Sequence, residues 1–220
     1  MLDALTFLVL AFVGFRIFSG TRLLGRREVR AHVVDILRGL RLRHFVFVLP
    51  VLAGVVVVAT LLVQIPGLSW GWWSAIGGVG TPALGVSQNS HGPLEWIIPA
   101  VFVAMLVPAL PLFAESEERM FRRGAQRWSR WRRVRRAVEF GLVHALIGIP
   151  IGVALALSVG GLYFTWAYLR GYRKGDDVLL DPTADERRRE VHGVMESTRA
   201  HLAYNLTIVA LVGLAFLLGA

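Results

Sequence analysis

The chain has 220 residues, 55% of them hydrophobic, and the apolar residues are concentrated in long blocks. Such blocks exceed what a soluble domain of this length needs, and they predict an all-α integral membrane protein. The formal net charge is +9, and the basic residues lie between the apolar blocks. This placement favours contact with a lipid bilayer and its anionic headgroups over nucleic-acid binding. The absence of cysteine excludes disulfides, a thiolate nucleophile and Cys-ligated metal.

The N-terminal part of the chain predicts two membrane spans. Leu2–Phe18 is expected to be a retained span, because it lacks the basic start and the cleavage site of a signal peptide. Arg16–His44 combines basic residues with helical apolar spacing, which predicts an amphipathic helix on the membrane surface. Phe45–Ile65 is expected to be the second span. Pro66–Gly92, which carries three tryptophans, is expected to form an interfacial loop on the opposite side of the membrane.

Two later apolar blocks contain proline. Pro93–Ala114 has three internal prolines, which predict a kink or a partly unwound segment just before a cluster of acids and arginines. Ala137–Leu169 is too long for one span, because a single helix would measure about 50 Å against a hydrocarbon core of about 30 Å. We therefore expect two short or tilted helices, Ala137–Ile149 and Ile151–Leu169, broken at Pro150.

The last helix is expected to open at Asp181-Pro182 as a polar segment and to become fully apolar over Leu206–Leu218. The segments together predict a polytopic bundle of about five to six membrane helices with amphipathic interfacial helices. We expect one integral membrane domain over residues 1–220. Residues 1–92 carry the N-terminal spans without motifs, and residues 93–220 carry the motifs.

The cluster from Glu115 to Gly124 lies at the end of the third predicted span and contains three acids and three arginines. Charges at this position are costly, which makes the cluster a candidate functional site. Glu118 and Arg122 are four residues apart and can form an ion pair on one helix face. Glu117 lies about 100° further round the helix and can point into a cavity. The alternative is a solvated helix end that only marks the membrane boundary.

Two further pairs of residues lie in the later apolar helices. Phe140 and His144 share one helix face, and His201 and Asn205 lie one turn apart where the last helix becomes apolar. Each pair is also explained by interhelical hydrogen bonding. Together with Glu117, however, they can converge on a water molecule. A glutamate in poorly hydrated surroundings can act as general base, while imidazoles can bind a divalent metal or stabilise an oxyanion.

The sequence lacks the His-Glu-x-x-His, Gly-x-Ser-x-Gly and Walker motifs. The order Glu-Glu-x-x-x-Arg, Phe-x-x-x-His, His-x-x-x-Asn instead resembles the CPBP family of intramembrane metalloproteases. This family includes CAAX proteases, bacteriocin-processing enzymes and type II CAAX prenyl endopeptidases. The resemblance covers about Pro93–Leu218, and the residues that carry it are Glu117, Glu118, Arg122, Gly124, Phe140, His144, His201 and Asn205.

The resemblance implies an intramembrane endopeptidase, a hydrolase that cleaves a peptide bond of a membrane-associated protein or peptide. It implies that Glu117 activates water and that Glu118, His144, His201 and Asn205 complete the catalytic set, with Arg122 and Phe140 supporting it. A divalent metal, zinc before others, would be held by His144, His201 and Glu117. A mechanism without metal stays open.

Two features depart from the family's usual pattern. The segment Asp185–Arg199 is long and charged, and the chain between Gly124 and Phe140 is rich in arginine. The same polar cluster would also suit a non-catalytic membrane interaction or immunity protein as an interhelical clamp, or a small transporter. The expected location is the bacterial plasma membrane with the basic loops in the cytoplasm.

Overall fold

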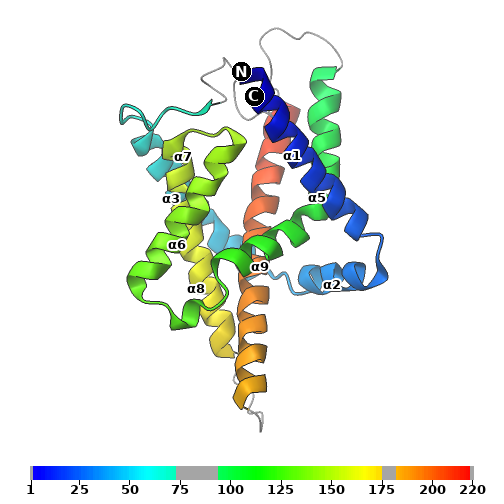
Figure 1. Cartoon of the computed structure of the whole chain (residues 1–220), viewed down its shortest axis with the longest axis vertical. Helices are drawn as coiled ribbons and strands as arrows, with labels where there is room; N and C mark the ends of the chain where they lie inside the picture. Colours follow the sequence, from blue (N-terminus) through cyan, green and yellow to red (C-terminus); the bar gives the residue numbers. More distant parts are fainter. Residues whose placement is uncertain (1, 73–93, 175–181, 219–220) are drawn as a thin grey trace.

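Figure 1 presents a computed structural model of the chain, which describes residues 2–72, 94–174 and 182–218. In these ranges the regular secondary structure is helical throughout, which confirms the all-α prediction. Most of the predicted interfacial loop, Pro66–Gly92, lies outside the described residues. The helices are α1 (Leu2–Leu23), α2 (Arg27–Arg38), α3 (Leu42–Leu62), α5 (Leu94–Phe121), α6 (Arg130–Val143), α7 (Ile151–Ala156), α8 (Ser158–Lys174) and α9 (Pro182–Leu218), with 3₁₀ turns η1 (Ala125–Arg127) and η2 (His144–Ile147).

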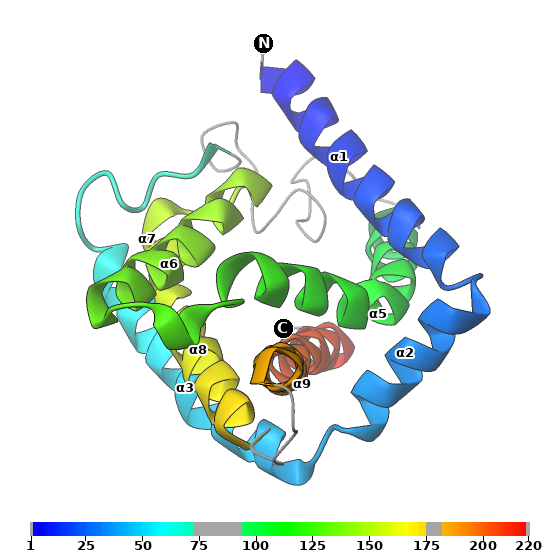
Figure 2. The same ribbon diagram turned by 60° about the horizontal axis from the view of Figure 1, so that its bottom comes forward.

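The long C-terminal helix α9 is the centre of the fold. Figure 2 shows it nearly end-on with the other helices around it, and it packs against α8, α5, α3 and α2. The contact with α8 is close, because a Cβ on Gly193 would lie 2.9 Å from the ring of Tyr168. Around the middle of α9 the side chains of Ala200, Leu202 and Ala203 are buried. Residues from this part of α9 can therefore meet those of several other helices.

Helix α5 changes direction near its middle, as both views of the ribbon show. Pro108 and Pro111 lie in this part of the helix, and proline removes a backbone donor and bends a helix. The helix nevertheless continues from Leu94 to Phe121. The predicted kink is therefore present, whereas the alternative of partial unwinding before the acids is wrong. The final turns of α5 run across α9, and Glu118 in these turns contacts His201 of α9.

The predicted break at Pro150 is confirmed. The chain leaves α6 through the turn η2, reverses at Gly148 with a φ of 94°, and begins α7 after Pro150. Helix α6 packs against α7 and α8, as expected for two segments joined by a tight connection. The boundaries differ from the prediction, since the first segment begins at Arg130 and the second continues to Lys174.

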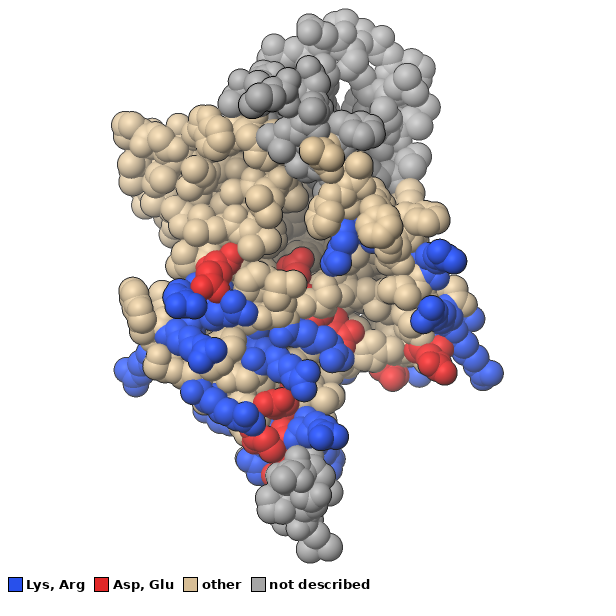
Figure 3. Space-filling model, viewed as in Figure 1, with Lys and Arg blue, Asp and Glu red and all other residues tan. Residues whose placement is uncertain are grey.

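Two stretches, Leu42–Leu62 and the nearly continuous Ile151–Lys174, are long and apolar enough to cross a membrane. They differ in environment, since 11% of the first stretch and 50% of the second are buried within the protein. The short helix α2 has the predicted amphipathic character and buries Val33 and Ile36. Figure 3 shows that lysine and arginine gather in the lower half of the molecule, around the N-terminal half of α9.

Candidate active site

The last turns of α5 hold a fully buried ion pair. Glu118 Oε1 lies 3.2 Å from Arg122 Nη1, with the two residues one helical turn apart. The exposed fraction is 0% for Glu118 and 1% for Arg122. Helix α5 ends at Phe121, directly before Arg122, and Gly124 reverses the chain with a φ of 86°, which favours glycine. The predicted ion pair is therefore present, inside the protein instead of at a solvated helix end.

His201 on α9 joins this ion pair. Its Nδ1 lies 2.9 Å from Glu118 Oε1, and its side chain is almost entirely buried. Because an ionised carboxylate only accepts hydrogen bonds, Nδ1 carries the proton and donates it. In the neutral ring, Nε2 then has a free lone pair. Glu118 thus fixes both the orientation and the tautomer of His201.

Glu117 faces the other side of the same imidazole. Its Oε2 lies 3.8 Å from His201 Nε2, which is too far for a direct hydrogen bond. This oxygen is buried and has no hydrogen-bond partner among the described residues, yet the Glu117 side chain as a whole is 33% exposed. The two neighbouring acids therefore differ in access. Glu118 is closed off from solvent, while Glu117 joins the buried site to the outside.

Three phenylalanine rings surround the guanidinium of Arg122. Its Cζ lies 4.0 Å from the ring centre of Phe140, 5.4 Å from that of Phe164 and 5.6 Å from that of Phe121. Phe164 also stacks on the imidazole of His201, with ring centres 4.4 Å apart. Cation–π contacts of this kind are strongest where water is excluded. The aromatic cage therefore holds the charged groups in a dry environment.

His144 lies on the other side of the cage. Its Nδ1 donates a hydrogen bond to the carbonyl oxygen of Phe140 at 2.8 Å, which leaves Nε2 as the acceptor of the neutral ring. The Phe140 ring contacts both imidazoles, with ring centres 4.9 Å from His144 and 5.5 Å from His201. The negative charge of Glu117 also acts on His144. His144 therefore belongs to the same cluster.

Asn205 is the predicted residue that the structure does not connect to the cluster. It lies one turn after His201 on α9 and is half-buried. Among the described residues its side chain forms no hydrogen bond to Glu117, Glu118 or His201. Phe164, in contrast, was not predicted as a site residue, yet it lies at the centre of the site. Nothing in the sequence distinguishes this ring from the other apolar residues of its segment.

The donor set matches a zinc site in chemistry, because His201 Nε2, His144 Nε2 and the unpaired Glu117 Oε2 are ligand types that zinc prefers. In geometry, Glu117 and His201 are separated by 3.8 Å, close to the roughly 3.3 Å expected between two ligands of a tetrahedral zinc ion. Within the described residues, no three His, Asp or Glu side chains form a group arranged to hold a metal ion. The facing donors of Glu117 and His201 could bind a metal ion, but they do not define which metal it would be.

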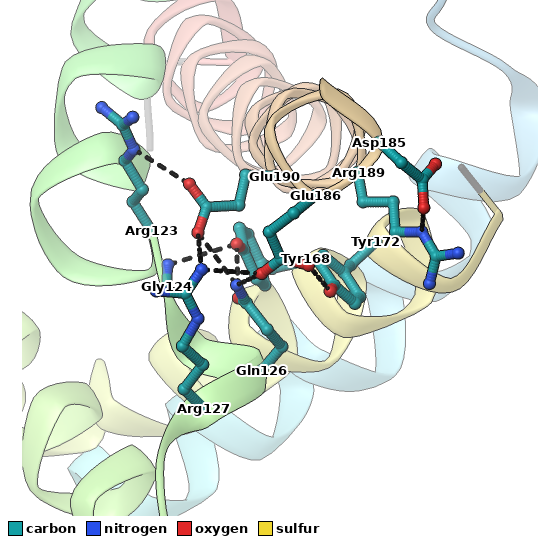
Figure 4. Close-up of polar contacts among 10 residues, drawn as sticks. All are labelled: Arg123, Gly124, Gln126, Arg127, Tyr168, Tyr172, Asp185, Glu186, Arg189 and Glu190. Carbon is teal, nitrogen blue, oxygen red and sulfur yellow. Dashed lines mark hydrogen bonds and ion pairs between the residues drawn. The ribbon is translucent and has the colours of Figure 1, made fainter. Parts of the chain in front are cut away.

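A second polar network lies further down α9, where Figure 4 shows acids of α9 facing residues of the turn after α5. Arg127 donates to Glu186 at 2.8 Å, and Gln126 donates to Glu186 at 3.0 Å and to Glu190 at 2.9 Å. The hydroxyl of Tyr172 donates to the other oxygen of Glu186. These hydrogen bonds, and the Tyr172 hydroxyl above all, lower the pKa of Glu186 to about 2.

This network joins parts of the two segments that depart from the family's usual pattern. The acids of the charged segment Asp185–Arg199 pair with the polar turn that opens the arginine-rich stretch after Gly124. Sequence analysis treated the two features separately and did not predict their contact.

No protein-family model, curated protein or solved structure matches the chain. The resemblance to the CPBP family therefore rests on the three sequence motifs alone.

Proposed function

We propose that this chain is a polytopic membrane protein and an intramembrane endopeptidase of the CPBP type, with Glu117 as the base that activates water. One observation carries the proposal. Three motifs, separated by up to 83 positions along the chain, meet at one imidazole, which Glu118 orients while Glu117 remains accessible. A carboxylate and an oriented imidazole on opposite sides of one small space are the parts that peptide hydrolysis needs.

The membrane assignment rests on the exposed apolar surface. Helix α3 leaves Leu49, Val57 and Leu61 more than half exposed, and α1 does the same with Phe12 and Phe15. Contiguous apolar surface on this scale is unfavourable in water and natural in a bilayer. The gathering of basic side chains at one end favours placing that end in the cytoplasm, and the proposed location is the bacterial plasma membrane.

In the proposed reaction, Glu117 takes a proton from a water molecule whose oxygen attacks the carbonyl carbon of the substrate. A C–O bond forms, the peptide C–N bond breaks, and Glu117 passes the proton to the departing amine. The amide of Asn205 is the donor proposed for the oxyanion, while neutral His144 offers only the lone pair of its Nε2. If zinc binds, the facing donors of Glu117 and His201 would hold it together with His144, and it would supply Lewis-acid polarisation of the carbonyl. The substrate is a membrane-associated protein or peptide.

The test is Glu117→Gln, which removes the base at nearly constant size. Cleavage of membrane-protein substrates, followed by comparing new N-termini in membranes with and without the protein, should fall by about 10²- to 10⁴-fold. Glu139→Gln, which removes a partly exposed acid on α6, is the matched control and should retain cleavage. Full activity of Glu117→Gln would rule out this residue as the base.

Elemental analysis of the purified protein beside His144→Ala/His201→Ala tests the proposed metal separately.

The alternative is a non-catalytic membrane interaction or immunity protein. It is favoured by the complete burial of Glu118 and Arg122 in the aromatic cage, which also suits an interhelical clamp. In that case Glu117→Gln and His201→Ala would lower thermal stability, and biological function would follow the amount of folded protein. Loss of cleavage by a variant with unchanged stability separates the enzyme from the clamp.

A further inference from the structure

We infer that a basic pocket between α2, α5 and α9 binds a phosphate group, either free phosphate or the headgroup of an anionic lipid. The pocket is an open hollow, and the roughly 400 Å³ of space between its side chains includes open solvent. Its polar wall is formed by six side chains from three helices and the turn after α5: His32, Glu115, Arg119, Arg123, Arg187 and Glu190.

The two acids of the pocket are already paired. Glu115 Oε2 lies 2.7 Å from His32 Nε2, and Glu115 Oε1 accepts from Arg119 Nε at 3.0 Å and from Arg119 Nη2 at 2.6 Å. Glu190 Oε2 accepts from Arg123 Nε at 3.4 Å. Both carboxylates therefore hold arginine side chains in place, and the repulsion that they would exert on an incoming anion is reduced.

The arginines retain donors that can bind an anion. Arg119 keeps Nη1, and Arg123 keeps both terminal nitrogens, since only its Nε contacts Glu190. Arg187 is exposed and forms no ion pair among the described residues. Three guanidinium groups face two carboxylates, so the pocket has a net positive charge. Guanidinium groups bind phosphate oxygens through paired, charge-assisted hydrogen bonds, which makes phosphate the matching ligand chemistry.

The remaining wall of the pocket is apolar and is formed by Val191, Val194 and Met195 of α9. Met195 packs on the buried apolar cluster that contains Leu110 and Leu202. A lipid can therefore place its headgroup on the arginines and its glycerol and upper acyl chain along this wall. Free phosphate would use the arginines alone. None of these lining residues contacts His201, so the inference holds whether or not the chain is a protease.

The test uses the full chain in a neutral detergent with three probes: inorganic phosphate, dioctanoyl phosphatidylglycerol and dioctanoyl phosphatidylcholine. Binding is measured by titration and by the shift of the thermal unfolding midpoint. The pocket variant is Arg123→Gln/Arg187→Gln. The control Arg130→Gln/Arg173→Gln removes the same charge from exposed positions outside the pocket. We expect saturable anion binding by the wild type and the control, and at least about tenfold weaker binding by the pocket variant.

The outcomes separate the two sources of phosphate. Binding of phosphatidylglycerol but not inorganic phosphate assigns the pocket to a lipid headgroup, and the reverse assigns it to a soluble anion. Equal weakening in the control, equal binding of phosphatidylcholine, or no saturable binding would overturn the inference. If the double variant misfolds, the single variant Arg187→Gln decides the test, because this side chain makes no ion pair with the described residues that its removal would break.

Discussion

Two polar clusters packed against α9, an upper one around Glu118 and a lower one around Glu186, use the same types of residue in opposite environments. In the upper cluster, Glu118 and Arg122 are buried, and their charged atoms lie 3.2 Å apart. In the lower cluster, Arg127 and Glu186 lie 2.8 Å apart but have side chains 66% and 34% exposed. The shorter pair is the weaker one, because water screens it, while the buried pair would leave an uncompensated charge if it were broken. Solvent exposure, and not the distance between the charged atoms, therefore decides how much each ion pair contributes to stability.

The clusters also differ in how completely their acids are paired. Glu186 accepts hydrogen bonds from Tyr172, Arg127 and Gln126 on both of its oxygens. Glu118 concentrates its contacts on Oε1, and its Oε2 is buried without a hydrogen-bond partner among the described residues. In the lower cluster, both oxygens of Glu186 accept hydrogen bonds, and these bonds hold α9 against the neighbouring segments. The upper cluster keeps acceptors open inside a dry cage, as a site for a ligand requires.

The largest effect is expected from removing one member of the buried pair. Arg122→Met keeps much of the volume but leaves Glu118 as a buried charge, so the free energy of unfolding should fall by about 3–5 kcal/mol. Chemical denaturation in detergent, followed by circular dichroism, measures this change.

The matched variant in the exposed cluster is Arg127→Met, which should have a much smaller effect because Arg127 is screened by solvent. The double variant Arg122→Met/Glu118→Gln should recover part of the loss, since it removes the stranded charge as well. Similar losses for Arg122→Met and Arg127→Met would show that burial does not separate the two clusters.

A medium effect is expected from the close helix contact behind the aromatic cage. A Cβ on Gly141 would lie 2.3 Å from the carbonyl oxygen of Ala154 and 3.1 Å from the backbone nitrogen of Ser158, and backbone atoms cannot move aside cheaply. Gly141→Ala should therefore destabilise the protein by about 1–3 kcal/mol. Gly213→Ala is the control, because a Cβ there meets nothing within 4 Å. If both variants unfold at the same denaturant concentration, the buried cluster does not depend on this packing.

Much of the fold follows from the sequence because apolar block length and proline position are local signals. The break at Pro150 and the helix start at Pro182 were predicted from these signals. The start of α6 was missed because its first turns are arginine-rich and do not extend the apolar pattern. Ser129, whose hydroxyl accepts from the Arg132 backbone nitrogen at 3.2 Å, is the capping signal that marks this start.

The candidate site likewise has a part that the sequence predicted and a part that it did not. Glu118, Arg122 and His201 were predicted from residue type and spacing, and they meet in the fold. The direction in which α5 crosses α9 and the ring of Phe164 between Arg122 and His201 depend on contacts between distant segments. Spacing along one helix carries no information about such contacts.

The smallest effect concerns the pH dependence of the exposed cluster. The hydroxyl of Tyr172, followed by Arg127, lowers the folded pKa of Glu186 to about 2, against 4.5 for an ordinary glutamate. A lowered folded pKa means that the contribution of Glu186 to stability is complete above about pH 4.5 and is lost as the pH falls through 2. Because the side chain is 34% exposed, this contribution should be below about 1 kcal/mol.

The difference in unfolding midpoint between wild type and Glu186→Gln should therefore shrink steadily from pH 5 to pH 2. Glu28→Gln, which removes an exposed acid of α2, is the matched control. A difference that grows on acidification would mean that the cluster does not stabilise the ionised form of Glu186.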